Sequence, residues 1–179
     1  MKAMALPYGF AIFCGILTVG LLLNREEEKY YFGLSFKESE ERYRELIEGT
    51  EDLITTTDGQ GNFTFVNHVV QNILGITPEQ CIGMSAFDFI HPDDQTMTKE
   101  WFNKSVAQKK KQMKLENRQV NALTGETRSV YWSSSFHYDA SGSMIGVGSI
   151  ARDITERKRA EETLKSLQNL LNNIINSMP

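Results

Sequence analysis

The stretch GSMIGVGSIARDITERKRAEE, residues 142–162, decides the fold because a strand pattern passes directly into a helix pattern within it. Residues 143–152 are predicted to form a strand, and the charged run that follows is predicted to be helical. Asp153 and Glu156 have the spacing of a helix N-cap and its third helical residue. A conformational change in the strand must therefore pass through Asp153, the joint between strand and helix, to reach the helix.

The chain before this joint predicts a small α+β domain. Two strands with period-two patterning are separated by Asp58-Gly59-Gln60-Gly61, a strong hairpin signal. His91-Pro92-Asp93-Asp94 places proline and two acids at the opening of a long helix. The predicted elements, in chain order, are a helix preceded by Ser35 and ending near Gly49, strands 52–57 and 62–67, short helices 68–74 and 77–80, a helix to about 108, and strands 112–120, 127–138 and 143–152.

Residues 39–165 resemble a PAS sensor domain with its C-terminal Asp-Ile-Thr motif. Three stretches carry the resemblance: SEERYRELIEGTEDLITTTDGQGNFTFVN (39–67), ILGITPEQCIGMSAFDFIHPDD (73–94) and the 142–162 stretch. The resemblance implies a five-stranded antiparallel sheet with helices on one face, of the PAS or profilin-like kind, and a cavity between them. It further implies the input domain of a bacterial membrane-bound sensor of the histidine-kinase type, which belongs to a two-component system.

The amino-terminal end predicts a membrane anchor. Ala3 to Leu23 is a run of 21 residues without a charge, which as a helix spans about 31 Å, close to the thickness of a bilayer core. A cleaved signal peptide is the alternative, although NREEEK after the run lacks a small-x-small cleavage site. We expect a transmembrane helix over residues 1–24, a connector over 25–38, and a single-pass protein of the cell membrane with the sensor domain (39–155) on the cytoplasmic side.

The carboxyl-terminal segment 156–179 predicts a signalling helix. Its apolar residues alternate in spacings of four and three, which is heptad spacing and favours a parallel dimeric coiled coil in a homodimer. A helix docked on its own domain would also need an apolar stripe. The closing LNNIINSMP resembles the opening of a further PAS repeat. The predicted coiled-coil positions are Ala160, Leu164, Leu167, Leu171, Ile174 and Met178.

Two sets of residues are candidates for function. By the family resemblance, Asp153, Ile154 and Thr155 relay the signal, with Asp153 and Thr155 hydrogen-bonding the helix root to the core; a simple helix cap is the alternative. Gly146 and Gly148 lie on one face of their strand and leave room for a ligand or for close packing of a helix. Trp132 lies on the apolar face of the preceding strand, and with these glycines it is a candidate pocket residue.

No cofactor, metal site or catalytic residue is predicted. Flavin-photosensing relatives need a cysteine in the stretch that reads here Ser85–Ile90, and haem-binding relatives need an axial histidine that Asp93–Gln108 does not offer. The three histidines have no carboxylate at metal-ligand spacing. Catalytic triads, phosphate loops, kinase boxes and cyclase motifs are absent from the sequence. A net charge of −4 gives no reason to expect nucleic-acid binding.

The leading hypothesis is a membrane-anchored sensory input module that detects a small ligand or partner. It would pass a conformational change through a coiled coil to a downstream output domain such as a histidine kinase, and would not itself be an enzyme. Two alternatives remain open. One is a ligand-free PAS module that serves in dimerisation and as a spacer, and the other is a cofactor-binding redox or gas sensor.

Overall fold

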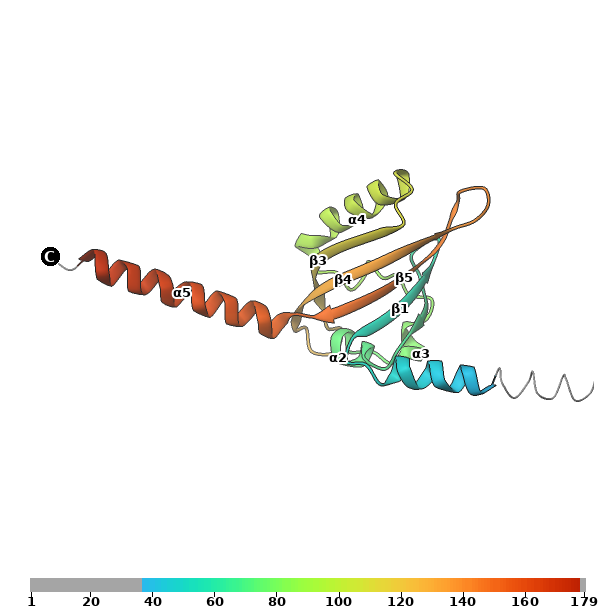
Figure 1. Ribbon diagram of the computed structural model, residues 1–179, viewed down its shortest axis with the longest axis horizontal. Coiled ribbons are helices and arrows are strands. Elements are labelled where there is room, and N and C mark those ends of the chain that lie inside the picture. The colour runs from blue at the N-terminus through green and yellow to red at the C-terminus, as the bar shows by residue number, and fades with distance from the viewer. Residues whose placement is uncertain (1–36, 178–179) are drawn as a thin grey trace, which may run out of the picture. The chain divides into compact units, whose positions relative to one another are not determined.

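The computed structural model describes residues 37–177 (Figure 1). The chain forms two compact units, Met1–Leu46 and Ile47–Pro179. Residues 37–48 are helical. The predicted membrane segment at 3–23 and most of the predicted connector lie outside the described residues. Between residues 37 and 177, no helix is both long enough and apolar enough to cross a membrane.

The second unit is built on one antiparallel sheet, which confirms the predicted fold class. Its strands lie in the order β2-β1-β5-β4-β3. The first strand in the chain, β1, therefore pairs with the last, β5, which is the central strand of the sheet. Each neighbouring pair is antiparallel. The strands are β1 (Leu53–Asp58), β2 (Phe63–Val66), β3 (Gln112–Val120), β4 (Thr127–Tyr138) and β5 (Met144–Asp153).

The helices begin and end close to their predicted bounds, because capping residues fix them locally. Thr77 and Gln80 form a reciprocal capping box at the start of α3. The side chain of His91 accepts a hydrogen bond from the Asp93 N–H at the start of α4. Gly75 ends α2 with φ of +76°, a left-handed conformation that glycine adopts without strain. The helices are α2 (Val70–Leu74), α3 (Pro78–Cys81), α4 (Pro92–Ala107) and α5 (Thr155–Ser177).

The hydrophobic core lies between the inner face of the sheet and the short helices. Leu53 of β1, Val130 of β4 and Ala151 of β5 have no exposed surface, and they cluster with Val70 and Ile73 of α2. These strand residues follow the period-two rule, by which alternate side chains share a face. Figure 1 shows α4 running along β3; α3 contacts β2, whereas α2 contacts β3.

A buried asparagine closes the β1–β2 end of the core. The Asn67 side chain is fully buried, and its oxygen accepts a hydrogen bond from the Ile54 N–H. Its amide nitrogen donates to the carbonyl oxygens of Ile47 and Asp52. These bonds satisfy three partly buried backbone groups, so one side chain holds Ile47, Asp52 and Ile54 together at the start of β1.

Candidate functional site

A cavity of about 80 Å³ lies against the inner face of the sheet. On this measure one water molecule needs only ~10–15 Å³, so the cavity has room for several waters or a small organic molecule. All five strands, the α4 helix and the segment before α4 contribute to its wall. The lining residues are Thr55, Thr57, Gly61, Phe63, Ala86, Phe87, Ile90, Thr98, Phe102, Met113, Leu115, Asn117, Gln119, Trp132, Ser134, Val147 and Ser149.

A chain of side-chain hydrogen bonds forms the polar part of this wall. The Asn117 amide oxygen accepts from the Trp132 indole N–H at 2.9 Å and from the Gln119 amide nitrogen at 2.8 Å. The Asn117 amide nitrogen donates to the Thr98 hydroxyl at 3.3 Å. Asn117, Gln119 and Thr98 are all buried. The chain therefore fixes the Trp132 ring and joins β3, β4 and α4 across the cavity.

The structure places the three predicted pocket residues differently. Trp132 lines the cavity and packs against the core. Gly146 and Gly148 do not line it; their neighbours Val147 and Ser149 do, because adjacent residues of a strand point to opposite faces. A Cβ atom on Gly146 would stand 2.6 Å from the Thr57 carbonyl oxygen. The missing side chain of Gly146 thus permits close approach of β1, a strand, whereas the sequence suggested a ligand or a helix.

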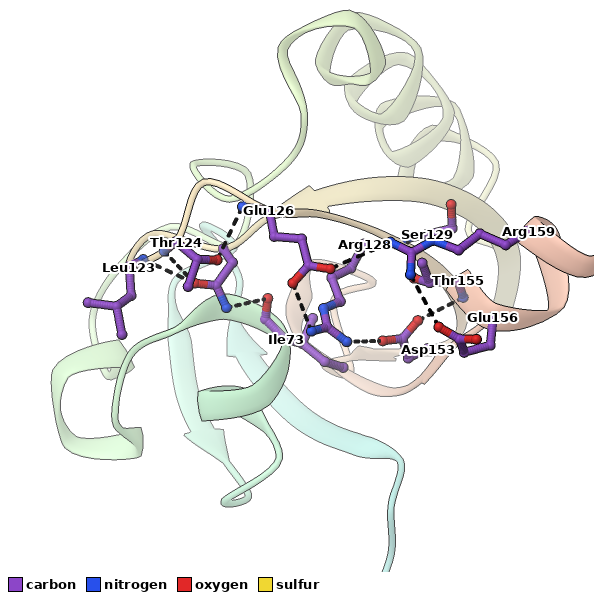
Figure 2. A network of polar contacts seen from close by, with 11 residues as sticks. Ile73, Leu123, Thr124, Glu126, Arg128, Ser129, Asp153, Thr155, Glu156 and Arg159 are labelled. Atoms are coloured by element: carbon purple, nitrogen blue, oxygen red, sulfur yellow. Dashed lines mark hydrogen bonds and ion pairs between the residues drawn. The ribbon is translucent and has the colours of Figure 1, made fainter.

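The second candidate site is the root of α5, where β5 passes into the helix (Figure 2). The Thr155 hydroxyl accepts a hydrogen bond from the Ser129 N–H at 3.0 Å, and the Ile154 N–H donates to the Ser129 carbonyl oxygen at 2.8 Å. The Asp153 carboxylate accepts from the Thr155 N–H at 2.8 Å and from the Arg128 guanidinium at 3.1 Å. Asp153, Ile154 and Thr155 therefore all bind the helix root to the first residues of β4.

The charge on Asp153 is stabilised by these contacts. Burial by itself would raise the pKa of the Asp153 carboxyl group. Hydrogen bonds from Thr155 and the Arg128 guanidinium outweigh that effect and hold the pKa of Asp153 below its ordinary value. The carboxylate is therefore ionised throughout the neutral range, and it carries an ion pair at the joint.

The capping geometry differs from the expected N-cap and third-residue pair. The α5 helix begins at Thr155, so Asp153 lies two residues before it and accepts from the Thr155 N–H. The Glu156 carboxylate pairs with Arg159 inside the helix. The Thr155 hydroxyl accepts a hydrogen bond from the Ser129 N–H of the neighbouring strand. The root is thus tied to the sheet more closely than an ordinary cap would be.

The polar contacts of the root continue into the β3–β4 turn (Figure 2). Glu126 pairs with Arg128 at 3.0 Å and with Arg159 of α5 at 3.6 Å. The Glu126 N–H donates to the Thr124 hydroxyl. Asn121, at the start of the same turn, accepts from the Thr124 N–H.

The same asparagine reaches a helix of the core. The Asn121 amide nitrogen donates to the Ile73 carbonyl oxygen of α2 at 3.4 Å, and Figure 2 shows this bond beside the turn. A Cβ atom on Gly75 would overlap the Asn121 amide oxygen, so only glycine fits at the end of α2. The contacts therefore run without interruption from α2, through the β3–β4 turn, to the first turns of α5.

The outer face of the sheet holds α5 by charge. Glu116 of β3 pairs with Lys158 at 2.6 Å and with Arg157 at 3.2 Å. The hydrogen bond from Lys158 lowers the pKa of the Glu116 carboxyl group. These side chains are 40–56% exposed, so each pair contributes little by itself. The pairs fix where the first turn of α5 rests on the sheet.

Comparison with known proteins agrees with this geometry. A family model described as the PAS fold matches residues 41–154, which is well over half of the chain. This protein belongs to the PAS family. The match includes the cavity, all of β5 and Ile154. The PAS domain therefore contains the cavity and the sheet side of the α5 root.

Curated relatives and a solved structure resemble parts of this PAS protein. The aryl hydrocarbon receptor nuclear translocator homolog of Drosophila melanogaster is 45% identical over 58 residues, which are 32% of this chain and 9% of that protein. Sporulation kinase C of Bacillus subtilis is 21% identical over 159 residues, 83% of this chain and 36% of the kinase. The chain therefore spans well under half the length of either relative.

A crystal structure of a sensory box histidine kinase/response regulator from Burkholderia thailandensis has a TM-score of 0.60 with this chain. It is 17% identical and covers 74% of this chain and 98% of its own. At this identity the likeness establishes the fold. PAS domains of this kind are typical of signal-transduction proteins such as histidine kinases.

The predicted coiled-coil positions of the PAS protein lie on an exposed helix. Leu164, Leu167 and Leu171 are each more than half exposed. Ala160 is exposed and Ile174 is 48% exposed. Met178 lies outside the described residues. Leu170 and Ile175, at 56% and 60% exposure, widen the apolar stripe beyond the predicted seam.

Sequence reasoning missed the amide pair of the cavity. Asn117 and Gln119 continue the inward-facing series of β3 that begins with Met113 and Leu115, so period-two alternation could have identified them. The partners of the helix root, Arg128 and Ser129, had no such signal. Among residues 37–177, no three His, Cys, Asp or Glu side chains come together in a way that could hold a metal ion.

Proposed function

We propose that this chain is a membrane-anchored sensory input module. It binds a small ligand in the cavity and passes a conformational change through α5 to a downstream output domain. One observation carries the proposal: β4 and β5 each belong to both sites. Val147 and Ser149 of β5 line the cavity, and Asp153 of the same strand holds the root of α5.

The route from the cavity to α5 is short on both strands. A ligand that displaces Ser149 acts on a strand whose end, four residues on, binds Thr155 and Arg128. On β4, the cavity residue Trp132 is three residues from Ser129, which binds the helix root through both of its backbone polar groups. A shift of either strand must change these contacts or move α5, because close-packed interiors transmit displacement.

The output domain in this proposal is a histidine kinase. Sporulation kinase C aligns with 83% of this chain, and the Burkholderia structure is named a sensory box histidine kinase/response regulator. The chain then supplies input alone and carries no catalytic residue of its own. It needs no haem or flavin, and the cavity of about 80 Å³ favours a smaller ligand.

A homodimer completes the proposal. The apolar stripe of α5 is exposed along its length, and its heptad spacing suits a parallel coiled coil with a second copy of this chain. Anchoring through residues 3–23, with the PAS domain on the cytoplasmic side of the cell membrane, would align two copies in parallel.

Disulfide crosslinking tests the dimer. In the full chain carrying Cys14→Ser, the remaining native cysteine is Cys81, which is buried; burial raises its thiol pKa to about 11, so it should not react. We expect Leu167→Cys to crosslink at least tenfold faster than Asn169→Cys, which lies outside the proposed seam. Equal rates at the two positions would contradict a parallel coiled coil.

The relay is tested with a fusion of the full chain to the kinase domain of a sensor histidine kinase. Asp153→Ala should abolish the response of kinase activity to a cavity ligand and leave the protein folded. The matched control is Glu156→Ala, which removes a carboxylate three residues away that is 91% exposed. A normal response in the Asp153 variant would reject the relay role.

Native mass spectrometry and an absorbance spectrum of the purified full chain separate this proposal from its alternatives. A small bound compound released on denaturation supports a ligand sensor. A coloured protein with a released cofactor supports the redox or gas sensor instead. A chain that contains no bound compound supports the spacer hypothesis, provided that a cavity-filling substitution such as Ser149→Leu also leaves the kinase activity of the fusion unchanged.

A further inference from the structure

The cavity wall contains no group that titrates near neutral pH. Its lining residues are aliphatic, aromatic, hydroxyl, amide and thioether side chains, together with one glycine. Lys99 contacts the ring of Phe87, 5.9 Å from its centroid, but does not line the cavity. An ion transferred into such a wall would lose its hydration and gain no opposite charge, which is strongly unfavourable. The lining therefore selects against charged ligands.

Aromatic rings form much of the apolar wall. Phe87 and Phe102 pack edge to face with centroids 5.3 Å apart, and Phe102 also packs against Phe136 at 5.6 Å. Phe63 and Trp132 line other parts of the cavity. Rings held in this way offer flat apolar surface with little conformational freedom, which suits an apolar molecule of similar shape.

The polar part of the wall offers an amide oxygen as a hydrogen-bond acceptor. The Asn117 oxygen already accepts two hydrogen bonds, from Trp132 and Gln119. The Gln119 side chain donates to Asn117, but its own amide oxygen accepts from no other described residue. Gln119 is only 2% exposed to solvent and lines the cavity, so a donor in the cavity can satisfy this oxygen. Whatever occupies the cavity is thus favoured if it donates a hydrogen bond to Gln119.

We propose that the cavity binds a small uncharged molecule with an apolar body and one O–H or N–H donor, which the Gln119 amide oxygen accepts. This inference rests on the proposed function, because it names the ligand class of the sensor's cavity. The uncharged lining disfavours an ionic ligand, the aromatic wall favours an apolar body, and the Gln119 amide oxygen favours a donor.

The test uses the full chain labelled with 5-fluorotryptophan. The chain has two tryptophans, so its fluorine NMR spectrum has two signals. Trp132 lies in the cavity wall, whereas Trp101 of α4 is 54% exposed and serves as the internal control. Four probes of similar size are titrated at pH 7: phenol, toluene, benzoate and benzylammonium.

We expect phenol to shift the Trp132 signal and leave the Trp101 signal in place. Toluene should bind about tenfold more weakly, since one hydrogen bond is worth roughly that factor. Benzoate and benzylammonium should not shift Trp132. In Gln119→Leu the affinity for phenol should fall to that for toluene, while the control Leu115→Met, at another lining residue, should keep the difference.

The outcomes separate this inference from the proposed function. If a charged probe or toluene binds as tightly as phenol, the ligand class is wrong and the cavity remains a binding site. If none of the four probes shifts Trp132, both the ligand class and the small-ligand sensor are rejected. Should Gln119→Leu fail to fold, the comparison of phenol with toluene in the unmodified chain still decides the role of the donor.

Discussion

The cavity and the root of α5 lie on the same two strands and use opposite chemistry. Hydrogen bonds between uncharged side chains stabilise the cavity wall: Asn117 bonds to Trp132, Gln119 and Thr98. The root adds ions to its neutral hydrogen bonds, with Arg128 between Glu126 and Asp153. Cavity amides are buried, whereas the Arg128 and Asp153 side chains are about a third exposed. Neutral hydrogen bonds thus occur where the side chains are buried, and ion pairs occur where water reaches them.

Burial explains the division. An ion in the cavity would lose most of its hydration, so only neutral donors and acceptors that satisfy one another persist there. At the root, water still reaches the ion pairs and reduces the cost of charge, but it also weakens each pair. The cavity network should therefore resist changes in pH and salt, and the root should respond to both. Four predictions test this contrast, beginning with the largest effect.

Replacing Asn117 with leucine should give the largest loss of stability. The change leaves the Trp132 and Gln119 donors buried without their acceptor. At about 1–3 kcal/mol for each of the two unsatisfied groups, the free energy of unfolding should fall by ~2–6 kcal/mol. Urea denaturation measures this loss. Leu115→Met, a volume-conserving change on the same strand, should cost less than about 1.5 kcal/mol, and equal losses would show that the network adds nothing.

Thr155→Val should have the next largest effect. Valine keeps the shape of the side chain but removes the oxygen that accepts from the Ser129 N–H. We expect a loss of about 1–3 kcal/mol in the free energy of unfolding, and weaker coupling of α5 to the sheet. Thr163→Val makes the same exchange at an exposed position of α5, and its effect should stay within ~0.5 kcal/mol. Similar losses at both positions would contradict a special role for the root.

Asp153→Asn should cost about 1 kcal/mol at neutral pH, because a charged acceptor is replaced by a neutral one. The folded-state pKa of Asp153 lies below the unfolded value of about 3.9. Its charge therefore stabilises the fold above that unfolded value, and this contribution is lost as the pH falls through the folded pKa. Urea denaturation of both proteins between pH 7 and pH 2.5 should show their difference shrinking in acid. A difference that does not change with pH would mean that charge is not what Asp153 supplies.

Glu116→Gln should have the smallest effect. Its pairs with Lys158 and Arg157 are exposed, so we expect a loss of about 0.2–1 kcal/mol. Because the screening length falls to about 3 Å in 1 M salt, the loss should disappear there. Hydrogen exchange in the first turn of α5, compared at 0.05 M and 1 M sodium chloride, measures it. Persistence of the loss at high salt would point to packing of the side chain rather than to its charge.

Local patterns were sufficient for the elements of the fold. The strands predicted at 112–120 and 127–138 have the same bounds as β3 and β4. The other elements are displaced by one or two residues at their ends. Period-two alternation, turn glycines and caps act within a few residues of one another, so each element is encoded in its own stretch. The resemblance carried by residues 142–162 then identified the family.

Local sequence patterns could not predict which residues bond to one another across neighbouring strands of the sheet. Asp153 pairs with Arg128, 25 residues earlier, because the register of β4 and β5 sets Val130 opposite Asp153. The same register brings Ser129 to Thr155, 26 residues later. Nothing near Arg128 or Ser129 in the chain marks them as partners of the helix root. Gly146 is a second example of a neighbour that the local sequence does not predict, because β1 takes the space left by its missing side chain.

Patterns along the chain were therefore enough to predict the order of strands and helices, the PAS family, the joint at Asp153 and the heptad spacing of α5. The folded sheet was needed to see which strand face lines the cavity, which amides satisfy one another there, and which charges hold the helix root. The physical reason is that periodicity and capping depend on neighbours along the chain. Burial and ion pairing depend on groups that the sheet brings together from distant parts of it.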